Sequence, residues 1–293
     1  MEIAIVTKDR PNSIETTLNR LESLDLTENI IVVDGSDSTK TKEICEKYSV
    51  GYFEQESNGM TAARNEAIEY CTSEYIAFID DDVRVSDTWY DTLLNELKNP
   101  EVKGATGELL HEETDLTFIE AVARAVLYGA PQEPGFVRRD GTIGGQFDIN
   151  QRSEVDHLPG CNMAYEVDAL NKVGGFNTDF DRGNSYREET YTSYLVSQIG
   201  KLIYNPDASL DHLRIDENRD IRDTLYTMAY NTRLFIHKAG VVSGIQNHIK
   251  HILRVCLLNI AYFCKYRKNY IHYLKGEVSS IVDIHVKNEF SQK

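Results

Sequence analysis

Residues 75–82 read Tyr-Ile-Ala-Phe-Ile-Asp-Asp-Asp, an uninterrupted apolar run that ends in three consecutive carboxylates. An apolar run without polar alternation is typical of a strand that is covered on both faces, as in a parallel sheet between helices. Three shorter strand-like runs precede it, each followed by a helical pattern: Glu2–Val6, Ile30–Val33 and Gly51–Phe53. This alternation predicts an α/β fold with a mostly parallel sheet flanked by helices.

The segments around these strands carry helical signals. Pro11 suits the first turn of a helix, and Ile14, Leu18 and Leu21 then repeat on one face. We further predict helices up to Tyr48, over Met60–Cys71 and over Trp89–Leu97, and strands over Val102–Leu109 and Lys201–Tyr204. The stretch Gly129–Gly160 shows no clear period, and we expect it to be irregular and functional.

Acidic side chains follow two of the predicted strands. Asp34 comes after the second strand, and Asp80, Asp81 and Asp82 come after the fourth. Ligands of open α/β sheets bind outside the carboxyl ends of the strands, so we expect these side chains to share one cleft. Clustered carboxylates repel one another unless a cation lies between them, which predicts an Mg²⁺ or Mn²⁺ site. The alternative is a solvated cluster that only caps the next turn.

Several well-known signatures are absent from the sequence. There is no GxxxxGK[ST] phosphate loop, no GxGxxG after the first strand and no GxSxG nucleophile elbow. These absences exclude the enzyme classes that depend on those motifs. Carboxylates at strand ends do not by themselves distinguish a nucleotide-sugar enzyme from a phosphatase or a kinase.

Short motifs follow one another in a definite order along the chain. They are Val6-Thr7 with Asp9-Arg10-Pro11, VVDGSDS (32–38), NGMTAARNEAI (58–68), AFIDDDV (77–83), LPGCNMAY (158–165), GGF (174–176), REET (187–190) and PDASLDH (206–212). In this order they resemble the family 2 glycosyltransferases of the GT-A fold, over residues 1–212. The resemblance implies a metal-dependent hexosyltransferase that uses a nucleotide-sugar donor of the UDP or GDP type.

The resemblance also implies where the donor binds. It assigns Thr7 and Asp34 to the nucleotide base and ribose, with Asp9 nearby, and Arg64 to the base or the diphosphate. In the acidic motif it assigns Asp80 to the ribose and Asp82 to the metal, with Asp81 beside them. The alternative for Arg64 is a surface arginine that pairs with an acidic neighbour on its own helix.

A catalytic base is implied at the acidic pair Glu188-Glu189. The acceptor hydroxyl must lose a proton as it attacks the anomeric carbon, and a carboxylate within hydrogen-bond reach can accept it. Ser185 and Glu188 have the spacing of a capping box, which explains Glu188 without any chemistry. Glu189 is therefore the candidate base, although the family more usually has Asp at this position.

Two further groups of residues resemble the family's site. His212 resembles a late metal-binding histidine, whereas a lone histidine is more commonly structural. Gly160, Cys161 and Asn162 resemble the segment that frames the donor sugar and the acceptor. Direct displacement needs no thiol nucleophile, so we reject that role for Cys161. His157 is a secondary candidate for the site.

Charge is distributed unevenly along the 293 residues, whose formal net charge is −16. Between Thr224 and Gly276 there are eight Lys or Arg and no Asp or Glu, whereas residues 1–223 carry a formal charge of −23. The acidic body predicts that nucleic acid is not a partner. Five cysteines without metal spacing, and an amino terminus without a signal-peptide pattern, favour the cytoplasm.

The basic segment has a helical apolar pattern between Ile245 and Leu274. Its longest uninterrupted apolar run, Val255–Leu258, is too short to span a bilayer. We weigh two interpretations equally: an interfacial helix pair on the inner face of the cell membrane, and packing on the catalytic domain or a second copy. We therefore expect a catalytic domain over 1–213 and a basic helical extension over 214–293.

The sequence predicts one function and leaves two alternatives open. The first expectation is an inverting transfer of a sugar to a hydroxyl of a glycan or a lipid-linked saccharide. One rival is a sugar-nucleotide nucleotidyltransferase, which would carry a glycine-rich basic loop after the first strand, unlike TKDRPNS (7–13). The other is a catalytically inactive relative that acts as a binding or scaffold protein.

Overall fold

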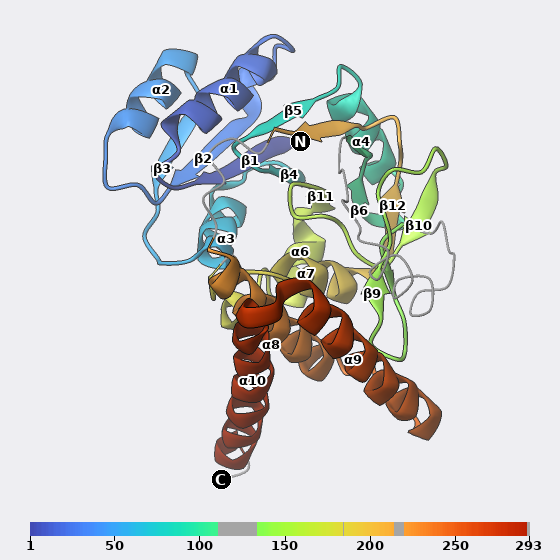
Figure 1. Cartoon of the computed structure of the whole chain (residues 1–293). Helices are drawn as coiled ribbons and strands as arrows, with labels where there is room; N and C mark the ends of the chain where they lie inside the picture. The colour runs from blue at the N-terminus through green and yellow to red at the C-terminus, as the bar shows by residue number, and fades with distance from the viewer. Residues whose placement is uncertain (111–133, 184, 214–219, 292–293) are drawn as a thin grey trace.

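The fold is known from a computed structural model, which describes residues 1–110, 134–183, 185–213 and 220–291. An eight-stranded sheet forms its centre, with helices on both faces (Figure 1). The strand order is β10-β12-β6-β11-β4-β1-β2-β3. Their bounds are β1 Glu2–Thr7, β2 Ile30–Asp34, β3 Gly51–Glu54, β4 Tyr75–Ile79, β6 Val102–Thr106, β10 Ser153–Val155, β11 Asn162–Glu166 and β12 Lys201–Tyr204.

The first four strands of this sheet run parallel, as predicted. Strand β1 pairs with β2 on one side and with β4 on the other. Thr7 lies opposite Asp34, and Ile5 lies opposite Ile79. The carboxyl ends of β1, β2 and β4 therefore meet at one edge of the sheet, which brings Asp34 and residues 80–82 to the same side.

Antiparallel pairing enters the sheet through β11, which lies between β4 and β6, and through β10 at the edge. A second sheet has the order β5-β13-β7, and its strands are β5 Val83–Val85, β13 Leu210–His212 and β7 Leu109–Leu110. The single strand predicted over Val102–Leu109 is wrong, because β6 ends at Thr106 and β7 belongs to the second sheet. At the break, the Gly107 backbone lies so close to Ala208 that no side chain fits between them.

The helices cover the sheet with apolar faces, as periodicity predicts. In α1, Ile14, Leu18 and Leu21 are fully buried. In α3, the small side chains of Ala63 and Ala67 allow close packing on the sheet. The elements of this layer are α1 Pro11–Glu22, η1 Thr27–Asn29, α2 Lys40–Tyr48, α3 Met60–Tyr70, α4 Trp89–Leu97, α6 Val167–Val173, η2 Thr178–Phe180 and α7 Glu188–Ser197.

The stretch expected to be irregular is partly built of short strands. β8 (Phe136–Val137) and β9 (Ile143–Gly144) form a two-stranded sheet, and β10 joins the edge of the central sheet. The chain up to Glu133 in this stretch lies outside the described residues.

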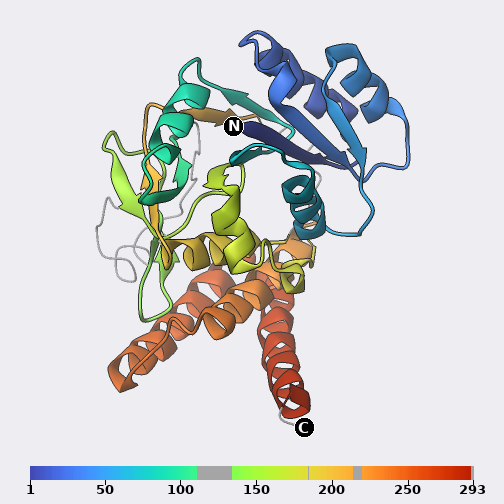
Figure 2. The same ribbon diagram turned by 180° about the vertical axis from the view of Figure 1, so that it is seen from behind.

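The C-terminal helices are α8 Ile221–Ala239, α9 Ile245–Tyr266, η3 Arg267–Asn269 and α10 Tyr270–Ser291. Helix α8 packs on the preceding part of the chain through a buried hydrophobic cluster that contains Phe180 of η2 and Tyr230 and Phe235 of α8. Helix α10 packs along α8, and α9 diverges from both (Figures 1 and 2). Among the described helices, none has the length and apolar character that a membrane span requires. The division at residue 213 stays a prediction.

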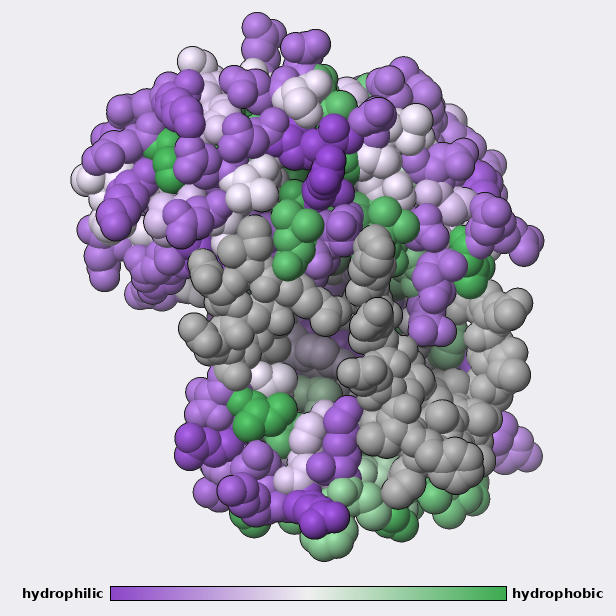
Figure 3. Space-filling model, turned by 45° about the horizontal axis from the view of Figure 1, so that its top comes forward, coloured by the Kyte–Doolittle hydropathy of each residue, from purple (hydrophilic) through white to green (hydrophobic). Residues whose placement is uncertain are grey.

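Polar and apolar surfaces lie at different ends of the molecule. Hydrophilic residues dominate the upper, N-terminal part in Figure 3, whereas apolar residues gather along the lower edge. The lower end is the one that the C-terminal helices form in Figure 1.

Candidate active site

The three aspartates after β4 have different surroundings. Asp80 is half-buried at the strand end, whereas Asp81 and Asp82 are buried. Arg10, from the loop after β1, donates to Asp81 Oδ1 and to Asp82 Oδ2, both at 2.6 Å. Thr7 Oγ1 donates to Asp81 Oδ2 at 2.5 Å. One arginine therefore compensates two buried carboxylates, whereas Asp80 is partly exposed and is not paired by Arg10 in this way.

Burial acts to raise the pKa values of Asp81 and Asp82, whereas their hydrogen-bond partners act to lower them. Burial raises the pKa of Asp81 to about 6, although Thr7 and Arg10 counteract it. Burial also acts to raise the pKa of Asp82, but hydrogen bonds with His212 and Arg10 outweigh it and lower that pKa below its ordinary value. Asp82 is therefore held as a carboxylate.

His212 reaches the aspartates because β13 pairs antiparallel with β5, so that His212 lies opposite Val83. Its Nε2 atom is 3.0 Å from Asp82 Oδ1 and 3.6 Å from Asp80 Oδ2. Cys161 completes the group: ligand atoms of Asp80, Cys161 and His212 all lie within 4.8 Å of one another. These three residues supply an oxygen, a sulfur and a nitrogen around one point.

The group includes Asp80, expected at the ribose, and not Asp82, expected at the metal, because both carboxylate oxygens of the buried Asp82 are engaged by Arg10 and His212. The metal role of Asp82 stays a prediction.

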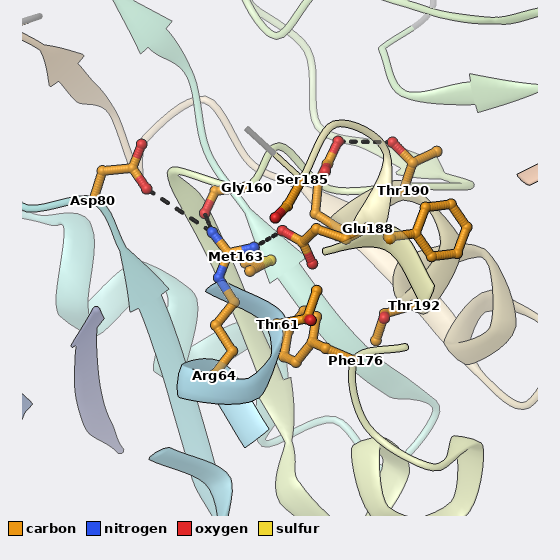
Figure 4. Close-up of polar contacts among 12 residues, drawn as sticks. Thr61, Arg64, Asp80, Gly160, Met163, Phe176, Ser185, Glu188, Thr190 and Thr192 are labelled. Atoms are coloured by element: carbon orange, nitrogen blue, oxygen red, sulfur yellow. Dashed lines mark hydrogen bonds and ion pairs between the residues drawn. The ribbon is translucent and has the colours of Figure 1, made fainter. Parts of the chain in front are cut away.

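Arg64 lies in the first turns of α3 and is almost completely buried (Figure 4). Its Nη2 donates to the carbonyl of Gly160 at 3.1 Å and is 3.9 Å from Asp80 Oδ1. Its Nη1 forms an ion pair with Glu188. Burial lowers the pKa of Arg64, and the charges of Asp80 and Glu189 oppose that effect. The alternative of a surface arginine is wrong, because the side chain points into the site.

The acidic pair begins α7, and its two members point in different directions. Glu188 is buried against Arg64, whereas Glu189 is half-exposed beside Gly160. Glu189 Oε1 accepts a hydrogen bond from Thr190 at 2.8 Å. Both carboxylates lie in the first turn of the helix, where the helix dipole favours negative charge.

The capping box predicted from Ser185 and Glu188 is wrong. The N-cap of α7 is Arg187, whose φ is +73°, and Ser185 has a φ of +52°. The Ser185 hydroxyl donates instead to Asp181 Oδ1 at 3.0 Å. The left-handed backbone conformations of Ser185 and Arg187 bend the chain sharply before α7, and this bend turns Glu188 inward.

Asp181 links this bend to α3. Its Oδ1 accepts from the backbone N–H of Thr61 at 3.0 Å, and its other oxygen accepts from the Thr61 hydroxyl. The same carboxylate accepts from Ser185. Asp181 therefore caps the helix that carries Arg64 and holds the loop that carries Glu188.

The residues expected at the base and ribose lie on the neighbouring strand ends. Asp34 is buried, and it accepts from the Ser36 backbone N–H at 3.0 Å and from Tyr52 at 3.2 Å. Asp9 is exposed, with a φ of +57°, and its N–H donates to Ser36 Oγ at 2.7 Å. The loops after β1 and β2 are thus joined, and the donor role of Thr7, Asp9 and Asp34 stays a prediction.

The segment after Pro159 divides into a surface part and a buried part. Gly160 and Cys161 are half-exposed beside Arg64 and His212. Asn162 is fully buried, and its side chain accepts from Trp89 Nε1 at 2.9 Å and donates to Ala208. The Asn162 side chain is therefore held inside the protein by its own partners, and the role of this segment at the donor sugar and the acceptor stays a prediction.

His157 is not part of this group of contacts. Its ring is buried beside Phe147, and Nε2 lies 3.2 Å from the carbonyl of Gly144. Burial lowers the pKa of His157 to about 4, with the charge of Arg187 acting in the same direction. These contacts indicate a structural histidine.

Two residues that the sequence did not single out are Arg10 and Asp181. Arg10 stands in a quoted motif, but only the fold brings its guanidinium to two aspartates 71 and 72 residues away. Asp181 follows a short 3-10 helix and belongs to no motif. No local pattern indicates either role, because both depend on partners from distant segments.

The fold and the strand-end site define an α/β chain of the GT-A type, with a cluster of side chains that could hold a metal ion next to a buried arginine. Residues 2–174 match the family described as "Glycosyl transferase family 2". The chain therefore belongs to glycosyl transferase family 2.

Two curated relatives each match more than half of this chain. A "Pre-mycofactocin glycosyltransferase" of Mycobacterium tuberculosis is 25% identical over 178 residues, which cover 59% of this chain and 33% of that protein. A "Glucosyl-dolichyl phosphate glucuronosyltransferase" of Haloferax volcanii is 23% identical over 194 residues, 62% of this chain and 58% of that protein. The match thus spans a third to somewhat over half of these relatives' lengths.

Solved structures share the fold at low identity. The mannosyltransferase PcManGT of Pyrobaculum calidifontis, in complex with GDP-Man and Mn²⁺, superposes with a TM-score of 0.59 at 14% identity. That match covers 96% of this chain and 87% of the mannosyltransferase. GalNAc-T7 with UDP, GalNAc and Mn²⁺ gives a TM-score of 0.58 at 15% identity, over 80% of this chain and 47% of that one.

Proposed function

We propose that this protein is a metal-dependent, inverting glycosyltransferase. It would move a sugar from a UDP- or GDP-linked donor to a hydroxyl of a glycan or a lipid-linked saccharide. The observation that carries the proposal is the convergence of Asp80, Cys161 and His212 on one point, next to Arg64 and Glu189. Membership of glycosyl transferase family 2 supports the same reaction class.

The donor groups fit a divalent cation. Asp80 and His212 offer oxygen and nitrogen, Cys161 adds sulfur, and Asp82 Oδ1 lies 3.0 Å from the same His212 ring nitrogen. Mg²⁺ prefers oxygen ligands alone, whereas a set that includes an imidazole nitrogen is more typical of a transition-metal ion, so His212 favours Mn²⁺ over Mg²⁺. A bound cation would supply positive charge that stabilises the departing diphosphate.

Arg64 is the protein's own positive charge at this point. Its guanidinium is buried between Glu188, Asp80 and the Gly160 carbonyl, which fixes its orientation. A positioned cation in a water-poor site stabilises negative charge that develops on a leaving group. We therefore assign Arg64 to the diphosphate, and Thr7, Asp9 and Asp34 to the nucleoside.

Glu189 is the proposed base. Glu188 is neutralised by Arg64 and buried, so it is unsuited to accept a proton from an acceptor, whereas Glu189 is half-exposed. The Glu189 carboxylate would take the acceptor's hydroxyl proton as the oxygen attacks the anomeric carbon. Attack on the face opposite the departing diphosphate inverts the anomeric configuration.

The relatives' names support the partners without specifying them. Two structural neighbours hold GDP-Man or UDP with Mn²⁺, in keeping with a nucleotide-sugar donor. The Haloferax relative is named for a dolichyl phosphate glycolipid, in keeping with a lipid-linked acceptor. We propose that the protein works at the cytoplasmic face of the membrane.

A thermal-shift panel with UDP and GDP, each with and without Mn²⁺ or Mg²⁺, tests the donor and the metal together. Ligands that bind only the folded state raise its melting temperature in a dose-dependent way. We expect one nucleoside diphosphate to raise it, and more strongly with Mn²⁺. The matching sugar nucleotides are then assayed for release of nucleoside diphosphate.

Each rival function has its own outcome in these assays. A nucleotidyltransferase would consume a nucleoside triphosphate and a sugar phosphate, and it would release inorganic pyrophosphate. An inactive scaffold would bind a nucleoside diphosphate and turn over no sugar nucleotide. Either result would overturn the proposed transfer.

A further inference from the structure

Helix α9 exposes its apolar face. The side chains on this face recur at intervals of three and four residues and are 42–82% exposed: Ile245, Ile249, Ile252, Leu253, Leu257, Ile260 and Phe263. On the opposite side of the helix, Arg254 and Ala261 are each only 6% exposed. The helix therefore turns its large aliphatic side chains outward, the reverse of a helix that packs on a core.

Helix α10 continues the same arrangement. Its inner side lies along α8, where Gly276 meets Tyr226 and where Arg233 pairs with Glu277. Its outer side carries apolar residues that are 36–59% exposed: Ile271, Leu274, Val278, Ile281 and Val282. We call these twelve side chains of α9 and α10 the apolar face. Of the two interpretations weighed for Ile245–Leu274, packing of this face on the catalytic domain is not seen, because the described residues leave it uncovered.

The surroundings of the apolar face are basic. Exposed lysine and arginine side chains lie on α9, on η3 and on α10: Lys250, Lys265, Arg267, Lys268 and Lys275. No Asp or Glu occurs between Thr224 and Gly276. The next two acidic residues of α10 have partners on the inner side: Glu277 pairs with Arg233, and Asp283 with Arg182 and Tyr230. A surface that combines exposed Ile, Leu and Phe with lysines and arginines matches an interface of acyl chains and anionic headgroups.

A second copy of the chain is a poorer occupant. Outside the apolar face, Ile199 and Ile221 are the exposed large hydrophobic residues of the described chain. The apolar surface that a second copy offers is therefore mainly the same face, which carries the same positive charge. Pairing two such faces would bring like charges together, whereas an anionic bilayer would attract them.

We propose that the apolar face docks the protein on an anionic lipid bilayer, with α9 lying in the plane of the membrane surface. The 22 residues of α9 would extend about 33 Å along that surface. The docking depends on the apolar face and its charge, and it would hold for an inactive protein as well. Its test is therefore separate from that of the proposed transfer.

Flotation of the full-length protein with lipid vesicles tests the docking. One set contains phosphatidylcholine alone, and the other contains about one third phosphatidylglycerol. The variant Ile249→Ser/Ile252→Ser/Phe263→Ser removes three exposed apolar side chains, so its fold should persist, as circular dichroism and the melting temperature would verify. Ile199→Ser, an exposed apolar residue of the catalytic body, is the matched control.

We expect wild type and Ile199→Ser to float with the anionic vesicles and to be released as salt rises, because the charge attraction is screened. The triple variant should bind at least about tenfold more weakly. Failure of wild type to bind anionic vesicles would overturn the proposal. So would a lipid-free dimer, measured by light scattering, that the triple variant dissociates, because the apolar face would then be an interface between copies.

Discussion

Arg64 and Glu188 form an ion pair in which the side chains are only 3% and 1% exposed. The two residues are 124 positions apart and come from the first turns of α3 and α7. A buried charge without its partner is costly, so each residue fixes the position of the other. The pair thereby sets the orientation of the guanidinium toward Asp80 and leaves Glu189 as the accessible carboxylate of its pair.

Glu188→Gln should destabilise the protein, because it removes the buried carboxylate that pairs directly with Arg64 and leaves only the more distant Asp80. We expect the free energy of unfolding to fall by about 3–5 kcal/mol, measured by urea denaturation. The double variant Arg64→Met/Glu188→Leu should recover much of this loss, because no buried charge remains. If Glu188→Gln were as stable as wild type, the ion pair would not hold the two helices.

Glu189→Gln should separate donor binding from transfer. The amide keeps the size of the side chain but accepts no proton at catalytic rates, so we expect kcat to fall by about 10²–10⁴-fold. The affinity for the nucleoside diphosphate should stay within about twofold of wild type, because Glu189 is assigned to the acceptor side. Glu69→Gln, on the exposed side of α3, is the matched control. An active Glu189→Gln enzyme would contradict the assignment of the base.

Arg10→Met should leave the neighbouring carboxylates of Asp81 and Asp82 to repel each other. Arg10 compensates both carboxylates, so without divalent metal the variant should lose about 2–3 kcal/mol of unfolding free energy. Addition of Mn²⁺ should raise the melting temperature more in the variant than in wild type. Lys201→Met removes a pair with the exposed Glu101 and should change stability far less. Equal losses in the two variants would show that the aspartates do not depend on Arg10.

Cys161→Ser should change the choice of metal. A thiolate favours softer ions, so the variant should lose affinity for Mn²⁺ relative to Mg²⁺. With Co²⁺ as a spectroscopic probe, wild type should show a thiolate-to-cobalt charge-transfer band that the variant lacks. Cys264→Ser, at an exposed cysteine of α9, should keep the band. A band that persists in Cys161→Ser would exclude the thiol as a ligand.

His157 should make stability depend on pH. Its pKa is about 4 in the folded protein and about 6.5 in the unfolded chain, so the unfolded state binds the extra proton between these values. Stability should therefore fall as the pH falls, by about 2 kcal/mol from this residue between about pH 7.5 and pH 5. Urea denaturation of wild type and His157→Gln at both pH values measures the difference. Parallel losses in the two proteins would rule out His157 as the cause.

The local patterns predicted much of the fold. Strand β4 and helix α4 have the predicted bounds, and β1, β2 and β3 each extend one residue further than predicted. Periodicity succeeds there because each element buries a continuous apolar face. The strand over Val102–Leu109 failed because Gly107 breaks it for a contact with Ala208, a residue about 100 positions away. The capping box failed for a similar reason, since Asp181 takes the Ser185 hydroxyl.

The amino-acid sequence by itself determined the four parallel strands with their helices up to Tyr70, the acidic strand end at Asp80, and the charge contrast between residues 1–223 and the basic segment 224–276. These properties depend on neighbours along the chain. The tertiary structure alone decided which side chains meet: Arg10 with two aspartates, Cys161 with His212, and Arg64 with Glu188. It also decided that the apolar side of α9 faces outward. A helical pattern defines an apolar face, but only the packing of the whole chain determines whether protein covers it.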